Sequence, residues 1–214
     1  MKFLEKLAPP VGAIAILFTT LSTNEYLYEQ YHRWNNKITE MELIYSHLVT
    51  SNKPEFLKGV DVIGHDLKID PNWIMAVMYL ESTLKPDAVN PENGASGLIQ
   101  FTRSTATGLN TSVEAIRLMS NVEQLNLIYR YLRPYKGRMN SFVDVYMAVF
   151  FPAAIGKEPD YVLQTKGLSA SYIASLNLAY DLNKDVVLTK HEVETAILGK
   201  INPEYHPILL KKKD

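Results

Sequence analysis

The stretch ESTLKPDAVNPENGASGLIQF, residues 81–101, begins with a glutamate and continues into a loop rich in Pro, Asn and Gly. Upstream of it, Asp70 followed by Pro71 is typical of a helix N-cap and first turn. We therefore expect a helix that starts there and runs to about Thr83, with Pro86 just past its end. The glutamate would then lie in the last helical turn, close to the loop.

Glu81 shares its face of this helix with apolar side chains. They are Ile74, Val77 and Met78, at helical spacings of three and four. The carboxylate is therefore expected to point at the core or at a cleft. Apolar surroundings and a helix C-terminus both raise a carboxyl pKa, and a carboxylic acid protonated near neutral pH can serve as a general acid. Alternatively, the methylenes pack on the helix while the carboxylate reaches solvent.

The loop after the helix combines backbone freedom with neutral polar groups. Gly94 and Gly97 permit conformations denied to other residues and allow close approach of a ligand. Ser96 and Gln100 offer neutral hydrogen bonds that suit the acetamide and hydroxyl groups of a sugar. The simpler alternative is a turn that joins two helices.

Residues 81–106 carry a series of motifs. These are Glu81-Ser82, then Pro86, Ala88 and Asn90, then GASGLIQF at 94–101 with Thr102, and finally Ser104-Thr105-Ala106. The series resembles the soluble lytic transglycosylase (SLT) domain, whose motifs read E-S, G-A-x-G-L-x-Q and a helix start with S-T-A. The resemblance implies a mainly α, lysozyme-like helical domain of the goose type, and within the family the chain looks most like phage-type members.

The resemblance also implies a reaction: cleavage of the β-1,4 bond between N-acetylmuramic acid and N-acetylglucosamine in peptidoglycan. Glu81 matches the only catalytic glutamate of the family, which closes a 1,6-anhydro ring and needs no cofactor. The residues expected to bind the glycan are Ser82, Ser96, Gly97, Gln100 and Tyr146. Ordinary glycosidases use two carboxylates; Asp87, Glu92 and Asp144 are candidates for a second, although each also fits a surface or capping position.

The chain departs from the family downstream of the loop. Members usually carry A-Y-N-A-G, whose Tyr and Asn line the glycan cleft, whereas this chain reads MAVFFPAAIG at 147–156. Phe150 and Phe151 thus replace Tyr-Asn. Tyr146, one helical turn earlier, could supply the phenol or could be a core aromatic residue. Lower or absent activity is therefore an alternative.

The rest of the sequence predicts helices. Segments with helical signals lie at 55–67, 71–83, 112–119, 121–135, 141–151, 169–180 and 190–199, and no apolar–polar alternation indicates a substantial sheet. A balance of 22 basic and 23 acidic residues argues against nucleic acid as a partner. The absence of cysteine excludes disulfides and thiol catalysis. We expect one globular domain at 53–214.

Two segments precede that domain. Residues 1–23 contain an apolar run after Lys2 and Lys6, which favours a membrane anchor or export signal, with a buried helix as the alternative. Residues 24–52 carry an apolar stripe that predicts a long amphipathic helix to about Val49, either a stalk or a helix packed on its own domain. An anchored or virion-borne enzyme would act in the bacterial envelope.

A second candidate site is DLNKDVVLTKHE, residues 181–192. It matches the ligand positions of an EF-hand loop, with Asp181, Asn183, Asp185, Val187 through its carbonyl, Thr189 and Glu192. Val186 replaces the usual glycine, and Thr189-x-x-Glu192 is also a capping box that needs no metal. We expect a structural Ca²⁺ site here, with the capping box as the alternative.

Two rival functions stay open at this point. A hydrolytic muramidase would differ in leaving a reducing rather than an anhydro muramyl end. A non-catalytic structural or glycan-binding protein of a virion or envelope would keep the fold without the reaction. Phe150-Phe151 favours the non-catalytic alternative, whereas Glu81 together with GASGLIQF opposes it.

Overall fold

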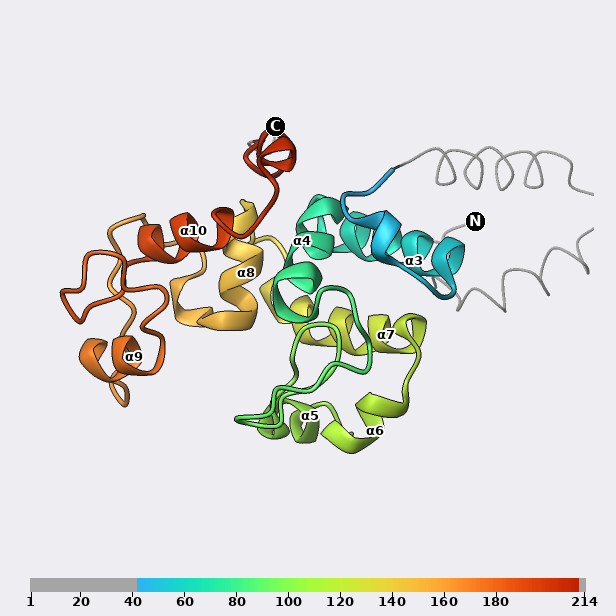
Figure 1. Ribbon diagram of the computed structural model, residues 1–214, viewed down its shortest axis with the longest axis horizontal. Helices are drawn as coiled ribbons and strands as arrows, with labels where there is room; N and C mark the ends of the chain where they lie inside the picture. Colours follow the sequence, from blue (N-terminus) through green and yellow to red (C-terminus); the bar gives the residue numbers. More distant parts are fainter. Residues whose placement is uncertain (1–41, 212–214) are drawn as a thin grey trace, which may run out of the picture. The chain divides into compact units, whose positions relative to one another are not determined.

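The computed structural model describes residues 42–211, which are mainly α (Figure 1). The helices in chain order are η1 Ser46–Leu48, α3 Lys53–Leu67, α4 Pro71–Ser82, α5 Arg103–Gly108, α6 Val113–Leu118, α7 Asn121–Leu132, η2 Arg133–Tyr135, α8 Phe142–Phe150, η3 Pro152–Ala154, α9 Ala170–Leu176, α10 Lys190–Leu198, η4 Pro203–Tyr205 and α11 His206–Leu209. Within this part of the chain, β-structure is limited to isolated antiparallel bridges such as Val89–Ser96 and Ser96–Phe101. The predicted mainly α fold is confirmed.

Helix α4 forms the centre of the core. It packs against α3, α8 and α11, and its side chains from Trp73 to Met78 are all buried. Its N-terminus is fixed by Asp70, whose side chain accepts a hydrogen bond from the Asn72 N–H at 2.8 Å. It ends where Thr83 takes a left-handed conformation. The helix predicted between Asp70 and Thr83 is confirmed.

A buried ion pair ties the C-terminal segment to α8. Lys190, the first residue of α10, donates to Asp144 of α8 at 2.8 Å, and both side chains are at least nine-tenths buried. Asp144 also accepts from the Gly156 N–H, and Lys190 also donates to the Lys157 carbonyl. Because both charges are satisfied, the pair fixes α10 beside α8 (Figure 1).

The helix predicted to reach Val49 is wrong over its described part. Leu43, Ile44 and Tyr45 are buried, residues 42–45 are not helical, and Tyr45 has a left-handed backbone conformation with a φ of 59°. Only the short 3₁₀ helix η1 follows. Tyr45 stacks on Tyr79 with ring centroids 3.7 Å apart, so burial of its ring overrides the helical periodicity. The compact unit therefore begins at Leu43 rather than at residue 53.

Two further predictions change or fall outside the structure. Helix α9 ends at Leu176 rather than continuing to Tyr180. The predicted anchor at 1–23 and most of the segment at 24–52 lie outside the described residues. Among residues 42–211, none of the helices has both the length and the apolar character needed to cross a membrane.

Candidate active site

Glu81 lies in the last turn of α4, where the helix packs against α8. The residue keeps partial exposure, while its carboxyl group is largely withdrawn from water. Burial raises the pKa of Glu81 to about 7, and a hydrogen bond with Tyr146 and the positive charge of Lys200 oppose this rise. Near neutral pH the carboxyl group is therefore present in both its protonated and its ionised form. A group that first donates a proton and then accepts one needs both forms to be accessible.

Tyr146, in the middle of α8, supplies the phenol beside Glu81. Its side chain is 3% exposed. Burial, followed by the negative charge of Glu81, raises the pKa of Tyr146 far above its usual range, so the phenol stays neutral. Its hydroxyl lies 2.6 Å from that of Tyr180. A neutral phenol in this position can donate a hydrogen bond to the Glu81 carboxylate when the latter is ionised.

Aromatic rings and one lysine surround this phenol. Phe150 stacks on Tyr146 with centroids 5.8 Å apart and meets the Tyr180 ring edge-on at 5.1 Å. The Lys200 ammonium lies 4.8 Å from the centroid of the Tyr180 ring. Phe151, by contrast, is 9% exposed and belongs to the core. Of the two residues that replace Tyr-Asn, Phe150 alone therefore joins the aromatic cluster next to Glu81.

The candidate second carboxylates do not act on Glu81. Asp144 is committed to its ion pair with Lys190. Asp87 and Glu92 are exposed on the loop. Across residues 42–211, no acidic side chain is among the groups that shift the pKa of Glu81. Among the described residues, none of these three candidates is therefore supported as a second carboxylate beside Glu81.

Two residues expected to bind the glycan, Ser82 at the end of α4 and Ser96 in the loop, make hydrogen bonds within the protein. The Ser82 hydroxyl lies 2.9 Å from the carbonyls of both Met78 and Leu98. Ser96 is fully buried, where its hydroxyl donates to the Gly94 carbonyl and accepts from Arg117. Burial gives no support to direct glycan contact by Ser82 or Ser96, which stays a prediction.

Gly97 is buried, whereas Gln100 is partly accessible to a ligand. Gly97 is buried at a φ of +82°, and a Cβ there would lie 2.5 Å from the Gln124 Oε1, so glycine is required by the loop itself. Gln100 keeps partial exposure, and its amide nitrogen donates to the Gly97 carbonyl at 3.0 Å. Of the four predicted residues on the loop side, Gln100 has the best access to a ligand.

One of three comparisons with known proteins found a match. Residues 62–148 match the family model described as the transglycosylase SLT domain. Residues 62–148 are thus similar to an SLT domain. The lysozyme-like fold implied by the sequence motifs is thereby shown. The search of curated proteins and the search of solved structures each found no match.

The SLT match covers Glu81, the loop and Tyr146, but it ends before other residues of the site. Tyr180 and Lys200 come from the C-terminal segment, and the sequence analysis missed both. The aromatic content of 169–180 was a weak signal for Tyr180, and no sequence signal indicated Lys200. Gln124 was missed as well: it is fully buried, donates to the Pro86 carbonyl at 2.6 Å and accepts from the Leu98 N–H.

The acidic loop lies between α9 and α10, outside the SLT match. The Thr189–Glu192 capping box is present in full, so that alternative is confirmed as a local structure. In the described part of the chain, no three acidic or histidine side chains gather into a group that could hold a metal. Calcium binding therefore stays a prediction for the residues expected to be its ligands, which are Asp181, Asn183, Asp185, Val187, Thr189 and Glu192.

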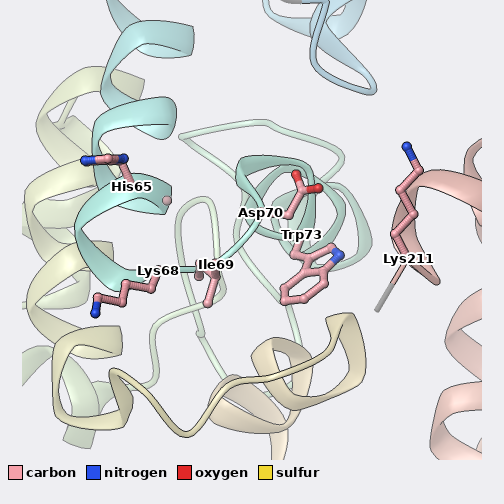
Figure 2. A pocket seen from close by; sticks show the side chains of 7 residues that line it. His65, Lys68, Ile69, Asp70, Trp73 and Lys211 are labelled. Carbon is pink, nitrogen blue, oxygen red and sulfur yellow. The ribbon is translucent and has the colours of Figure 1, made fainter. Parts of the chain in front are cut away.

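A hollow at the opposite end of α4 is distinct from the Glu81 site. Figure 2 shows His65 and Lys68 at the end of α3, Asp70 and Trp73 at the start of α4, and Lys211 across from them. Trp73 and Glu81 are eight residues apart on α4, about 12 Å along a helix. The Trp73 indole nitrogen is buried without a partner in the described structure.

Proposed function

We propose that the chain is a peptidoglycan lytic transglycosylase that cleaves the MurNAc–GlcNAc β-1,4 bond and leaves 1,6-anhydro muramyl ends. The SLT domain supports transglycosylase-type action on peptidoglycan in general. The observation that carries the finer proposal is the single Glu81 carboxyl, with its pKa raised to about 7 and the neutral Tyr146 phenol beside it.

In the first step, protonated Glu81 donates its proton to the glycosidic oxygen. The bond from the muramyl C1 to that oxygen breaks, and the GlcNAc unit leaves as an alcohol. Positive charge develops at C1 while Glu81 becomes a carboxylate. The hydrogen bond with Tyr146 and the charge of Lys200 both favour this ionised form, because each lowers the pKa of Glu81.

In the second step, the Glu81 carboxylate takes the proton of the muramyl C6 hydroxyl. The C6 oxygen then bonds to C1 and closes the 1,6-anhydro ring. The proton lost in the first step is regained, so the reaction consumes no water and needs no cofactor. A single acid–base group suffices because the nucleophile belongs to the substrate, whereas ordinary glycosidases need a second carboxylate.

The aromatic cluster would form one wall of the glycan site. Phe150 and Tyr180 flank Tyr146, and a sugar ring can pack its apolar face on such rings. The polar Asn usual at this wall is absent, so binding there would rest on ring contact more than on side-chain amide hydrogen bonds. Activity on a narrower range of glycan strands is the expected consequence.

The test is digestion of purified peptidoglycan with the full chain, followed by mass spectrometry of the soluble muropeptides. Wild type should release anhydro-muropeptides, Glu81→Gln should release none, and Glu92→Gln, which alters an exposed loop carboxylate, should match wild type. Products that carry one added water would identify a hydrolytic muramidase. Absence of any Glu81-dependent release would leave a glycan-binding role without turnover, the alternative that the Phe150 substitution favours.

The proposed place of action follows from the substrate. Peptidoglycan lies in the bacterial envelope, so we propose that the protein opens the wall locally, as in phage entry or lysis. Association with a membrane through residues 1–23, or with a virion, would confine the enzyme to a small area of wall. Detection of the full chain in membrane or virion fractions, and its loss on deletion of residues 1–23, tests that part of the proposal.

A further inference from the structure

The loop at 181–192, which the proposed reaction does not use, has its acidic side chains folded onto its own backbone. The two Asp181 carboxylate oxygens accept from the N–H groups of Asp185 at 3.2 Å and Val186 at 3.0 Å. Asn183 also accepts from the Asp185 N–H, and Asp185 accepts from the Val187 N–H. These bonds curl the chain into a tight loop whose side-chain oxygens come from alternate residues.

The missing glycine does not prevent this curl. Val186 takes a φ of 65° and Lys184 a φ of 62°. A β-branched residue is strained in this region, where glycine is usual. The surrounding hydrogen bonds hold Val186 there nonetheless. The sequence objection to an EF-hand-like loop therefore does not hold for the backbone.

Glu192, the last residue of the loop, has an oxygen without a partner. Its Oε2 accepts from the Thr189 N–H at 2.9 Å and from the Thr189 hydroxyl at 2.8 Å. Its Oε1 is buried and has no hydrogen-bond partner in the described structure, on a residue only 8% exposed. Both oxygens belong to one carboxyl group, so the orphan oxygen lies at the same end of the loop. A buried carboxylate oxygen without a partner is unfavourable unless a proton or a cation meets it.

We propose that this loop binds one Ca²⁺ ion. Its ligands are the side-chain oxygens of Asp181, Asn183 and Asp185, the Val187 carbonyl and the Glu192 carboxylate. Thr189 is at the ninth position of the loop, which is also a ligand position. Ca²⁺ takes six to eight oxygen ligands in flexible geometry, and a carboxylate at the twelfth loop position commonly binds it with both oxygens. Mg²⁺ is disfavoured because it demands a stricter octahedral arrangement with several waters.

The loop as it stands must close around the ion. Within residues 42–211, no three acidic or histidine side chains already gather as a metal group. The capping box and the metal site are compatible, since the cap uses the Glu192 Oε2 and leaves the Oε1.

The position of the loop gives the ion a structural task. Tyr180 directly precedes Asp181, and its hydroxyl lies 2.6 Å from that of Tyr146. At the other end of the loop, Lys190 forms the buried ion pair with Asp144. An ion that closes the loop would fix both ends and so hold Tyr180 against Tyr146. Metal binding itself is independent of the proposed glycan reaction, and its test does not use that reaction.

The experiment is titration of the full chain with CaCl₂, and separately with MgCl₂, by calorimetry after removal of divalent ions by a chelator. Thermal denaturation is followed in parallel. Wild type should bind one Ca²⁺ and gain about 5–10 °C in Tm at a Ca²⁺ concentration about 100 times Kd, with no comparable gain from Mg²⁺. Glu192→Gln should lose this gain while its amide oxygen still caps Thr189.

Two further variants keep the test decisive. Asp185→Asn changes an exposed ligand and leaves the core intact, so it should weaken Ca²⁺ binding at least tenfold even if Glu192→Gln folds poorly. Glu194→Gln makes the same change as Glu192→Gln two residues further along α10, outside the loop, and it should match wild type. Absence of saturable Ca²⁺ binding by wild type, or equal binding by Asp185→Asn and wild type, would overturn the proposal.

Discussion

Replacement of Glu81 by glutamine should stabilise the protein at alkaline pH even as it removes the proposed activity. Burial raises the pKa of Glu81 from 4.5 to about 7. At 1.36 kcal/mol per pH unit, ionisation of this group lowers the free energy of unfolding by about 3 kcal/mol. This value is an upper bound because Glu81 keeps partial exposure. The Glu81→Gln variant has no ionisable group at this position, so its free energy of unfolding is not lowered in this way.

The sign of the effect follows from proton binding. Below pH 4.5 the carboxyl is protonated in the folded and unfolded states alike, so it adds no pH dependence. Between pH 4.5 and about 7 the folded state keeps a proton that the unfolded state has released, so wild-type stability falls as pH rises. Above pH 7 the full loss is present. The stability of Glu81→Gln relative to wild type should therefore grow by about 3 kcal/mol between pH 4 and pH 8.

Urea denaturation followed by circular dichroism at several pH values between 4 and 8.5 measures this difference. Other titrating groups cancel because both proteins share them. Glu92→Gln, an exposed loop change, should follow the wild-type curve at every pH. If the difference between Glu81→Gln and wild type stays constant across this range, the pKa of Glu81 is ordinary and the argument for a general acid near neutral pH fails.

Three more outcomes are expected. Tyr146→Phe should slow muropeptide release about 10- to 100-fold, which corresponds to the loss of one hydrogen bond to a charged group. It should also move the alkaline limb of the pH–activity profile to higher pH, because the lost hydrogen bond lowers the pKa of Glu81. Gly97→Ala should lower the free energy of unfolding in urea by more than about 1 kcal/mol, because φ is +82° and a buried side-chain oxygen lies 2.5 Å from the new Cβ. Lys190→Met should lower it by about 3–5 kcal/mol by leaving Asp144 buried and unpaired, and Lys190→Met combined with Asp144→Leu should recover part of that loss.

The parts of the site that follow from local signals were predictable from the sequence. Asp70 and Pro71 start α4, and Pro86 lies just past its end, so the last-turn position of Glu81 follows from local start and stop signals. Its burial follows from the three apolar residues on the same face. These are short-range effects, since each depends on neighbours within a few residues along one helix.

Tertiary contacts account for what the sequence did not predict. The apolar stripe continues through Tyr45 as a helix would have it, yet Tyr45 has a left-handed backbone conformation and stacks on Tyr79. Gly97 and Ser96 are residue types common in loops that bind ligands. Here they belong to a loop that packs against Gln124, whose side-chain oxygen accepts from the Leu98 N–H. The contact of Tyr180 with Tyr146 could not be predicted from local sequence, because the two residues are 34 positions apart.

The proposed active site extends beyond the residues that match the SLT family model. The SLT match ends at 148, whereas the hydroxyl that meets Tyr146 belongs to Tyr180. Burial is the main cause of the raised Glu81 pKa, and the Tyr180 ring and Phe150 cover the phenol beside it. The segment that carries Tyr180 is in turn fixed by the ion pair of Lys190 with Asp144. Tyr180, which meets Tyr146, and Lys200, whose charge lowers the pKa of Glu81, therefore bring a part of the chain without family motifs to the surroundings of this glutamate on α4.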